Sequence, residues 1–149
     1  MPKTLLGFVD LPPVWLVGFM ALASLLATQI DAAAIMLWPG RVLIALGVAL
    51  AVWAALSFRR AKTTIVPRGR PDALVADGPY TVSRNPIYLA DLLILAGWCI
   101  SLGFLVSLVF VGTFWWVLDT RFVKPEERVL ADDLGAPYLA YKERVRRWI

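Results

Sequence analysis

The residues best suited to chemistry lie in two short segments on either side of a long apolar run. The first segment, residues 74–89, reads LVADGPYTVSRNPIYL and has two glycine or proline breaks just before the apolar run. A helix that begins there offers free backbone N–H groups and the positive end of its dipole, which suit a carboxylate or phosphate. The second segment has adjacent acids, Glu126 and Glu127. These acids are either part of a binding site or a solvated first turn that complements a helix dipole.

A further acid, Asp91, lies inside the apolar run, three residues beyond Tyr88. An isolated charge is costly in lipid, so Asp91 is a candidate functional residue. The alternative is a residue at the membrane interface that extends towards water. Asp119, at the end of the same run, is expected at the interface.

The sequence has no histidine and a single cysteine, Cys99. Histidine is the commonest metal ligand and the usual general base, so its absence argues against the usual zinc sites and against Ser-His-Asp chemistry. We predict no metal site, and we expect Cys99 to be a small buried hydrophobe. The net charge of +4 is not accompanied by a nucleic-acid motif, so we assign it to membrane topology and contact with anionic lipids.

The elements that must position these residues are membrane helices. Hydrophobic residues make up 60% of the 149 and the mean hydropathy is +0.71, whereas roughly 45–50% is usual for globular proteins. We predict one domain, 1–149, with an all-α polytopic membrane bundle. Its expected parts are helices at about 11–30, 42–58, 87–101 and 103–119, a turn at Asp31 and Pro39-Gly40, a cytoplasmic loop 59–86 and a cytoplasmic tail 120–149.

The apolar run from Ile87 to Leu118 is too long for one straight crossing. Its about 32 residues would form ~48 Å of helix against a hydrocarbon core of roughly 30 Å. Ser101-Leu102-Gly103 is the best place for a turn, which gives a helical hairpin. The alternative is one long tilted helix.

The basic residues set the expected orientation. Thirteen of the 15 lie in the loop or the tail: Arg59, Arg60, Lys62, Arg68, Arg70 and Arg84, then Arg121, Lys124, Arg128, Lys142, Arg144, Arg146 and Arg147. By the positive-inside rule both regions face the cytoplasm, which fits four crossings with both termini inside, in a bacterial inner membrane. The tail is expected to be amphipathic helix broken near Gly135-Ala136-Pro137, lying on the membrane or folded back over the loop.

The motifs resemble a known family. They are Gly78-Pro79-Tyr80, Arg84-Asn85-Pro86-Ile87-Tyr88, Glu126-Glu127, and Gly135-Ala136-Pro137-Tyr138 with Tyr141, Arg144 and Val145. In this order and spacing, over Thr64 to Trp148, they resemble the isoprenylcysteine carboxyl methyltransferases and the related membrane phospholipid methyltransferases. The resemblance implies a multi-helix enzyme that binds S-adenosylmethionine between loop, hairpin and tail. It would methylate a carboxylate or an amine on a lipophilic acceptor from the bilayer.

The resemblance also implies particular site residues. Cofactor contacts would fall on Leu74, Val75, Tyr80, Asn85, Pro86, Tyr88 and one of Glu126 and Glu127, and Arg121 would lie near a substrate-contacting arginine. Arg84 or backbone N–H groups could meet the methionine carboxylate of the cofactor. An amine acceptor needs a base, which without histidine must be Glu126, Glu127 or Asp91.

The chain departs from the family at Asn85 and near Asp72, where many members have histidine. Asparagine can form hydrogen bonds but cannot carry a proton. Two other functions remain open at this point: a non-catalytic membrane scaffold subunit, and a membrane reductase that uses a nicotinamide cofactor.

Overall fold

The computed structural model describes residues 10–27, 37–61, 74–103 and 105–149. In these residues the regular structure is helical, apart from one isolated bridge between Ser83 and Arg146. This confirms the all-α prediction. The elements are α2 (Pro12–Ala27), α3 (Leu37–Arg60), η2 (Gly78–Thr81), α4 (Pro86–Ser101), η3 (Leu105–Leu108), α5 (Val109–Val117), η4 (Leu118–Val123), α6 (Lys124–Leu134) and α7 (Ala136–Arg144).

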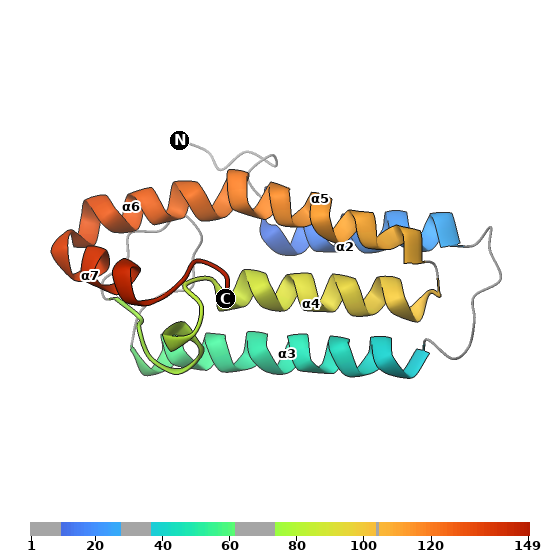
Figure 1. Cartoon of the computed structure of the whole chain (residues 1–149), viewed down its shortest axis with the longest axis horizontal. Helices are drawn as coiled ribbons and strands as arrows, with labels where there is room; N and C mark the ends of the chain where they lie inside the picture. Colours follow the sequence, from blue (N-terminus) through green and yellow to red (C-terminus); the bar gives the residue numbers. More distant parts are fainter. Residues whose placement is uncertain (1–9, 28–36, 62–73, 104) are drawn as a thin grey trace, which may run out of the picture.

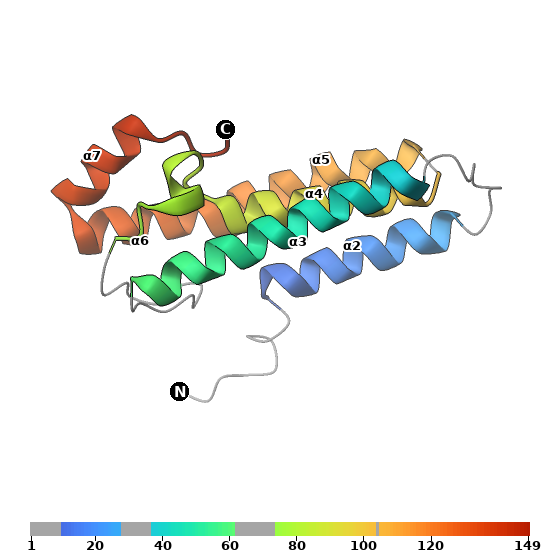
Figure 2. The ribbon, with the colours of Figure 1, turned by 90° about the horizontal axis from the view of Figure 1, so that it is seen from below.

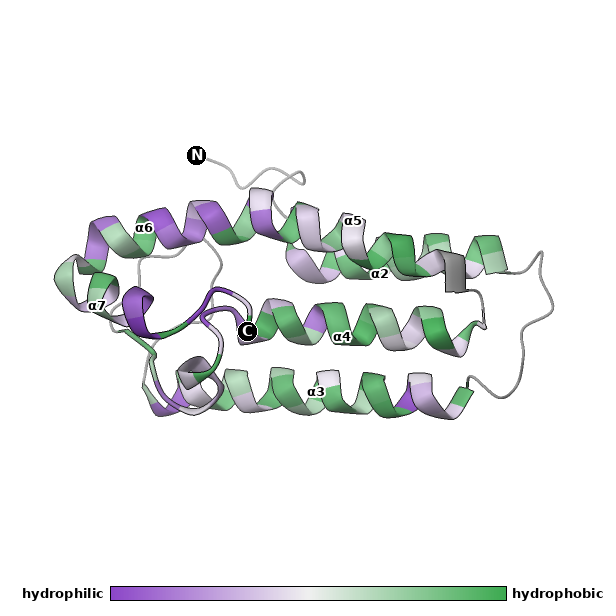
Figure 3. Cartoon of the chain, in the orientation of Figure 1, coloured by the Kyte–Doolittle hydropathy of each residue, from purple (hydrophilic) through white to green (hydrophobic). Residues whose placement is uncertain are grey.

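The long helices lie side by side with their axes roughly aligned (Figures 1 and 2). Helix α4 packs along α3, while α2 and α5 pack on the other side of α4. Apolar residues predominate along these four helices, and polar residues gather at the end that holds α6, α7 and the C-terminus (Figure 3). The molecule therefore has an apolar body and one polar end.

Helix α3 is, in the described part of the chain, the one helix long and apolar enough to cross a membrane. Its 24 residues span about 36 Å. Helices α2 and α4 are shorter apolar helices of 16 residues each. Large apolar side chains of α3 are exposed, including Leu46, Val52 and Leu56. An exposed apolar surface of this kind suits contact with lipid.

The second helix was predicted at about 42–58, whereas α3 begins five residues earlier, at Leu37, and ends at Arg60. Pro39 and Gly40 lie in its first turn instead of in the preceding turn. Proline is tolerated there because the first N–H groups of a helix have no partner within it. The described residues do not include Asp31 or residues 28–30, the predicted end of the first helix.

Glycine at three positions, Gly40 and Gly47 in α3 and Gly97 in α4, lets these two helices approach closely. A Cβ atom added to Gly97 would lie 2.5 Å from the carbonyl oxygen of Gly40, and one added to Gly47 would lie 2.7 Å from Ile94 Cγ1. Small residues at such crossings allow backbones to pack against each other in membranes, where burial from water contributes little. Gly40 is therefore explained by packing and not by a turn.

The chain turns at the end of α4, where the sequence predicted a break. Helix α4 ends at Ser101, and Gly103 has φ +68° and donates its N–H to the Ile100 carbonyl at 2.9 Å. Glycine adopts this left-handed conformation without steric cost. Helix α5 then returns beside α4 (Figure 1), and Leu95 and Phe114 share one buried cluster.

The sequence predicted a helix at 103–119 and a tail from residue 120. This predicted end is wrong, because the returning helix does not end at Asp119. It continues from α5 through η4 into α6 and ends at Leu134. The segment η4 is π-helical, and the Lys124 N–H donates to the Asp119 carbonyl five residues back. Such a widened turn, in front of a proline that has no N–H of its own, lets the helix continue past Pro125. The two adjacent acids thus lie on an extension of an apolar helix.

Candidate functional site

The candidate site lies at the polar end of the bundle, where η2, the start of α4, α6, α7 and the C-terminal residues meet. Gly78, at the start of η2, has φ +59°, and a Cβ atom there would lie 2.7 Å from Ser57 Oγ of α3. Glycine is required both by this conformation and by this approach. It seats the Gly-Pro-Tyr turn directly on α3.

Residues 83–85 hold the end of the chain, residues 145–148, which we call the C-terminal strap. The Arg84 N–H donates to the Arg146 carbonyl at 2.9 Å. The Ser83 hydroxyl and Asn85 Nδ2 both donate to the Arg147 carbonyl, at 3.2 and 3.0 Å. The end of the predicted tail therefore contacts residues 83–85, at the end of the predicted loop.

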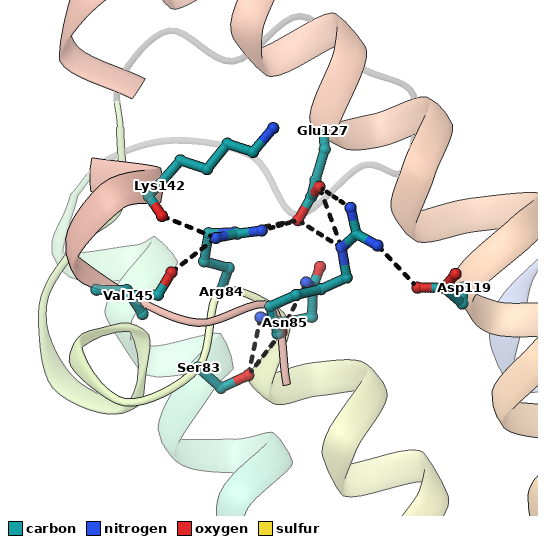
Figure 4. A network of polar contacts seen from close by, with 8 residues as sticks. Ser83, Arg84, Asn85, Asp119, Glu127, Lys142 and Val145 are labelled. Carbon is teal, nitrogen blue, oxygen red and sulfur yellow. Dashed lines mark hydrogen bonds and ion pairs between the residues drawn. The ribbon is translucent and has the colours of Figure 1, made fainter. Parts of the chain in front are cut away.

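Arg84 joins the strap to α6. Its Nε and Nη2 donate to Glu127 Oε1 at 3.1 and 2.9 Å, and its Nη1 donates to the carbonyls of Lys142 and Val145 at 3.0 and 2.7 Å (Figure 4). Four hydrogen bonds thus fix this guanidinium group. Arg84 therefore binds both Glu127 and the end of α7.

Arg147, in the C-terminal strap, contacts the same carboxylate from another side. Its Nη2 donates to Glu127 Oε2 at 2.7 Å, and its Nη1 lies 3.3 Å from Asp119 Oδ1. Lys124 Nζ contacts the other Asp119 oxygen at 2.6 Å. Three cations and two carboxylates form one connected network.

Glu127 is ionised in this network. Its side chain is 6% exposed, and burial by itself would raise its pKa. Hydrogen bonds from Arg147 and Arg84 outweigh burial, so the pKa lies below the usual glutamate value. The interpretation of this acid as a solvated helix turn is therefore wrong.

Glu126 has a different environment. The Tyr88 hydroxyl donates to its Oε2 at 2.7 Å, and within the described chain no cation pairs with it. Burial raises the pKa of Glu126, the Tyr88 hydrogen bond lowers it, and the neighbouring Glu127 charge raises it; the result lies above the usual value. The two adjacent acids thus differ in charge neutralisation, and only Glu126 retains an oxygen without a hydrogen bond to the described residues.

An aromatic cluster lies beside these acids. Val75, Tyr80, Tyr138 and Tyr141 are buried together, with Leu74 packed against them. Tyr141 donates its hydroxyl to the Tyr80 carbonyl at 2.7 Å. Burial raises the pKa of Tyr141 to about 12, against the opposing effect of Arg84, so the phenol stays protonated.

Tyr138 differs from its neighbours because its hydroxyl is buried and has no hydrogen-bond partner among the residues described. Its side chain is 1% exposed. A buried polar atom without a partner costs about 1–3 kcal/mol, which a ligand could recover. From the sequence, Tyr138 was visible only as part of the Gly135-Ala136-Pro137-Tyr138 motif, and Arg147 only as a charge that indicates topology.

Two predicted catalytic residues lie elsewhere: Arg121 lies apart from this cluster, and Asp91 lies deeper in the bundle. Arg121 is half-exposed, pairs with Asp10 at 2.6 Å and stacks over Trp15 at 5.7 Å, away from Glu127. Asp91 is 8% exposed, one helical turn beyond Tyr88. Asp72 lies outside the described residues.

The structure therefore brings most of the predicted site residues to one end of the bundle. These are Leu74, Val75, Tyr80, Arg84, Asn85, Pro86, Tyr88, Glu126 and Glu127. Among the described residues, one Glu126 oxygen and the Tyr138 hydroxyl have no hydrogen-bond partner. The carboxylate oxygen suits a hydroxyl or ammonium donor, the phenol suits a polar acceptor, and the aromatic cluster suits a flat ring. The arrangement can hold a polar cofactor beside an apolar layer.

Comparison with known proteins identifies a family. A family model described as phospholipid methyltransferase matches residues 35–136, about two thirds of the 149 residues. An uncharacterized protein of Haemophilus influenzae is 36% identical over 63 residues, which are 42% of this chain and 100% of that protein. No solved structure matches the chain.

Proposed function

Because the chain belongs to the phospholipid methyltransferase family, we propose that it is an integral membrane enzyme that transfers a methyl group from S-adenosylmethionine to a lipophilic acceptor. The family match confirms the resemblance found in the motifs. The observation that carries the proposal is the Tyr88–Glu126 hydrogen bond beside the Arg84–Glu127 ion pair, at the junction of hairpin, loop and tail. A scaffold subunit would not need this arrangement of buried polar groups.

The residues at the polar end fit the proposed cofactor. S-adenosylmethionine supplies a methyl group on a positively charged sulfur, and the protein has mainly to align donor and acceptor. Glu126, with one oxygen free, would accept hydrogen bonds from the ribose hydroxyls or the ammonium group. Tyr138 would give its unpartnered hydroxyl, and Val75 and Tyr80 would contact the flat base.

Other residues of the site act through their neighbours. Arg84 and Arg147 fix Glu127 and the C-terminal strap, and their bonds leave little capacity for a ligand. The cofactor carboxylate would instead meet the free N–H groups at the start of α4. Asn85 binds the strap through its amide, and Leu74 and Pro86 shape the wall.

The proposed membrane arrangement has four crossings, formed by α2, α3, α4 and the continuous helix of α5 and η4. Both termini and the polar end would face the cytoplasm of a bacterial inner membrane, with the acceptor entering sideways from the bilayer. The basic residues of the loop and tail support this orientation, as do the exposed apolar side chains of α2, α3 and α5. Methyl donor and lipid would then meet at the cytoplasmic interface.

Calorimetric titration of the full chain with S-adenosylhomocysteine, in detergent and in nanodiscs, tests the proposal. We expect saturable binding that Glu126→Gln weakens at least tenfold and that Glu143→Gln, an exposed acid of α7, leaves unchanged. Absence of binding to the wild-type protein in both environments would contradict the methyltransferase assignment. Binding of a nicotinamide cofactor in its place would select the reductase.

A further inference from the structure

Tryptophan side chains gather where the polar end meets the apolar body. The ring centroids of Trp115, in α5, and Trp148, in the C-terminal strap, lie 6.1 Å apart. Trp115 and its neighbour Trp116 are 43% and 61% exposed. Tryptophan is enriched at the headgroup level in membrane proteins, because its ring is apolar and its N–H is polar. In the proposed membrane arrangement, Trp148 therefore places the C-terminal strap at the level of the headgroups.

Two exposed arginines, at the end of α7 and in the C-terminal strap, have no acidic partner in the described part of the chain. Residues 136–149 contain four basic residues and one acid, Glu143. The Arg144 side chain is exposed and donates only to the Ala140 carbonyl of its own helix, at 3.3 Å. The Arg146 side chain is exposed and forms no ion pair with a described residue. Both guanidinium groups are therefore available to an anion outside the protein.

The C-terminal strap connects these exposed groups with the candidate site. It runs from the end of α7 towards the apolar body (Figure 1). The carbonyl groups of Arg146 and Arg147 accept hydrogen bonds from residues 83–85. The Arg147 guanidinium group binds Glu127 and Asp119. A contact that holds the Arg146 side chain from outside therefore also restrains Arg147 on the buried carboxylates.

We propose that Arg144 and Arg146 form, beside Trp148, a docking surface for anionic phospholipids, and that this contact tightens cofactor binding by holding the C-terminal strap closed. A guanidinium group pairs with a phosphate through two parallel hydrogen bonds, and a bilayer presents phosphates at the level of the tryptophan rings. A strap that lipid already holds closed loses less conformational freedom when the cofactor binds. The effect on cofactor affinity rests on the proposed methyltransferase activity, whereas lipid docking rests only on the membrane arrangement.

Amide hydrogen exchange in nanodiscs measures closure of the C-terminal strap without a cofactor. The Arg84 N–H donates to the Arg146 carbonyl at 2.9 Å, so this amide is protected only while the strap is closed. We expect it to exchange about fivefold more slowly in phosphatidylglycerol than in phosphatidylcholine nanodiscs at low salt. The difference should shrink at high salt, because salt screens exposed charges. Equal exchange of the wild-type protein in the two lipids at low salt overturns the proposal.

Two double variants distinguish the docking surface from general charge. Arg144→Gln with Arg146→Gln removes two exposed positive charges from the surface, and Arg59→Gln with Arg60→Gln removes two at the end of α3. We expect the first variant to lose the lipid difference and the second to keep it. Arg144→Lys with Arg146→Lys keeps both charges and should also keep the difference. An unaltered difference in the first variant, or an equal loss in both glutamine variants, overturns the assignment to this surface.

Calorimetric titration with S-adenosylhomocysteine in the same two lipids tests the effect on cofactor binding. We expect about three- to tenfold tighter binding in phosphatidylglycerol, and equal affinities in the two lipids for Arg144→Gln with Arg146→Gln. Equal or weaker wild-type binding in phosphatidylglycerol, beside a lipid-dependent exchange of the Arg84 amide, overturns the coupling and leaves lipid docking intact. Absence of binding in both lipids overturns the proposed function, and the Arg84 exchange still decides whether the strap docks on lipid.

Discussion

Tyr138 and Tyr141 form a matched pair of phenols in one buried cluster. Tyr141 donates to the Tyr80 carbonyl at 2.7 Å, whereas Tyr138 has no partner among the described residues. Their hydroxyl groups therefore differ in role: the Tyr141 hydroxyl holds η2 against α7, whereas the buried Tyr138 hydroxyl holds no described residue. Removing the two hydroxyl groups one at a time therefore distinguishes an effect on stability from an effect on ligand binding.

We expect Tyr138→Phe to keep or raise the melting temperature. The same change should weaken S-adenosylhomocysteine binding about three- to tenfold, because one hydrogen bond contributes about 0.5–1.5 kcal/mol. Tyr141→Phe should lower the melting temperature, because the Tyr80 carbonyl loses its donor. Melting followed by tryptophan fluorescence and calorimetric titration measure both effects. A lower melting temperature for Tyr138→Phe with unaltered affinity would contradict the role of this phenol.

Glu127 makes stability depend on pH. Its pKa is lowered in the folded protein, so the unfolded chain binds more protons at acid pH. The contribution of its ion pairs is complete above the usual glutamate value of about 4.3 and is lost as pH falls through the lowered folded pKa. The melting-temperature difference between wild type and Glu127→Gln should therefore be constant above about pH 5 and shrink towards pH 3. Glu143→Gln is the control, and a difference that grows on acidification would refute the assignment.

The residue types of the site were predictable, but their pairing was not. The adjacent acids Glu126 and Glu127, and Asp91 inside the apolar run, can be recognised in the sequence because acidic residues are rare beside apolar helices. Which arginine meets Glu127 depends on a strap that returns from the end of the chain, 20 residues beyond. Periodicity carries no information on such a contact, and Arg147 was therefore counted only as a topological charge.

At the scale of elements, hydropathy predicted the helices and their hairpin turn because both follow from local composition. It misplaced the start of α3, since Pro39-Gly40 is typical of turns and only the packing against α4 explains the glycine. It also ended the last apolar helix at its first charge. The helix continues through the widened turn of η4, and Asp119 in this turn pairs with Arg147, 28 residues further along the chain, which is a contact that local composition does not predict.

The crossing of α3 and α4 gives a test of this packing. Gly97→Ala places a Cβ 2.5 Å from the Gly40 carbonyl, so we expect a loss of about 1–3 kcal/mol through overpacking and a lower melting temperature. Gly112→Ala in α5 is the matched control, because nothing lies within 4 Å of its Cβ. Alanine is also the better helix former there, by about 1 kcal/mol, so stability should hold or rise. Equal melting temperatures for the two variants would argue against close contact of the helices.

At the scale of the whole molecule, the site exists only where segments distant in sequence converge on one end of an apolar body. Residues 74–88, α6, α7 and the strap meet there because the hairpin returns α5 alongside α4 and continues past its start (Figures 1 and 2). The opposite end holds the hairpin turn and the start of α3. The two ends should therefore lie on opposite sides of the membrane.

Single cysteines can locate the two ends. Cys99 is the one cysteine of the chain and is fully buried, so a Cys99→Ala background leaves no native thiol. Glu143→Cys reports the polar end, and Trp38→Cys reports the opposite end beside Gly40. The basic residues near the polar end favour the cytoplasm by the positive-inside rule. In intact spheroplasts a membrane-impermeant maleimide should therefore label Trp38→Cys at once and label Glu143→Cys only after permeabilisation. Labelling of Glu143→Cys from outside would invert the arrangement and place the proposed site away from the cytoplasmic methyl donor.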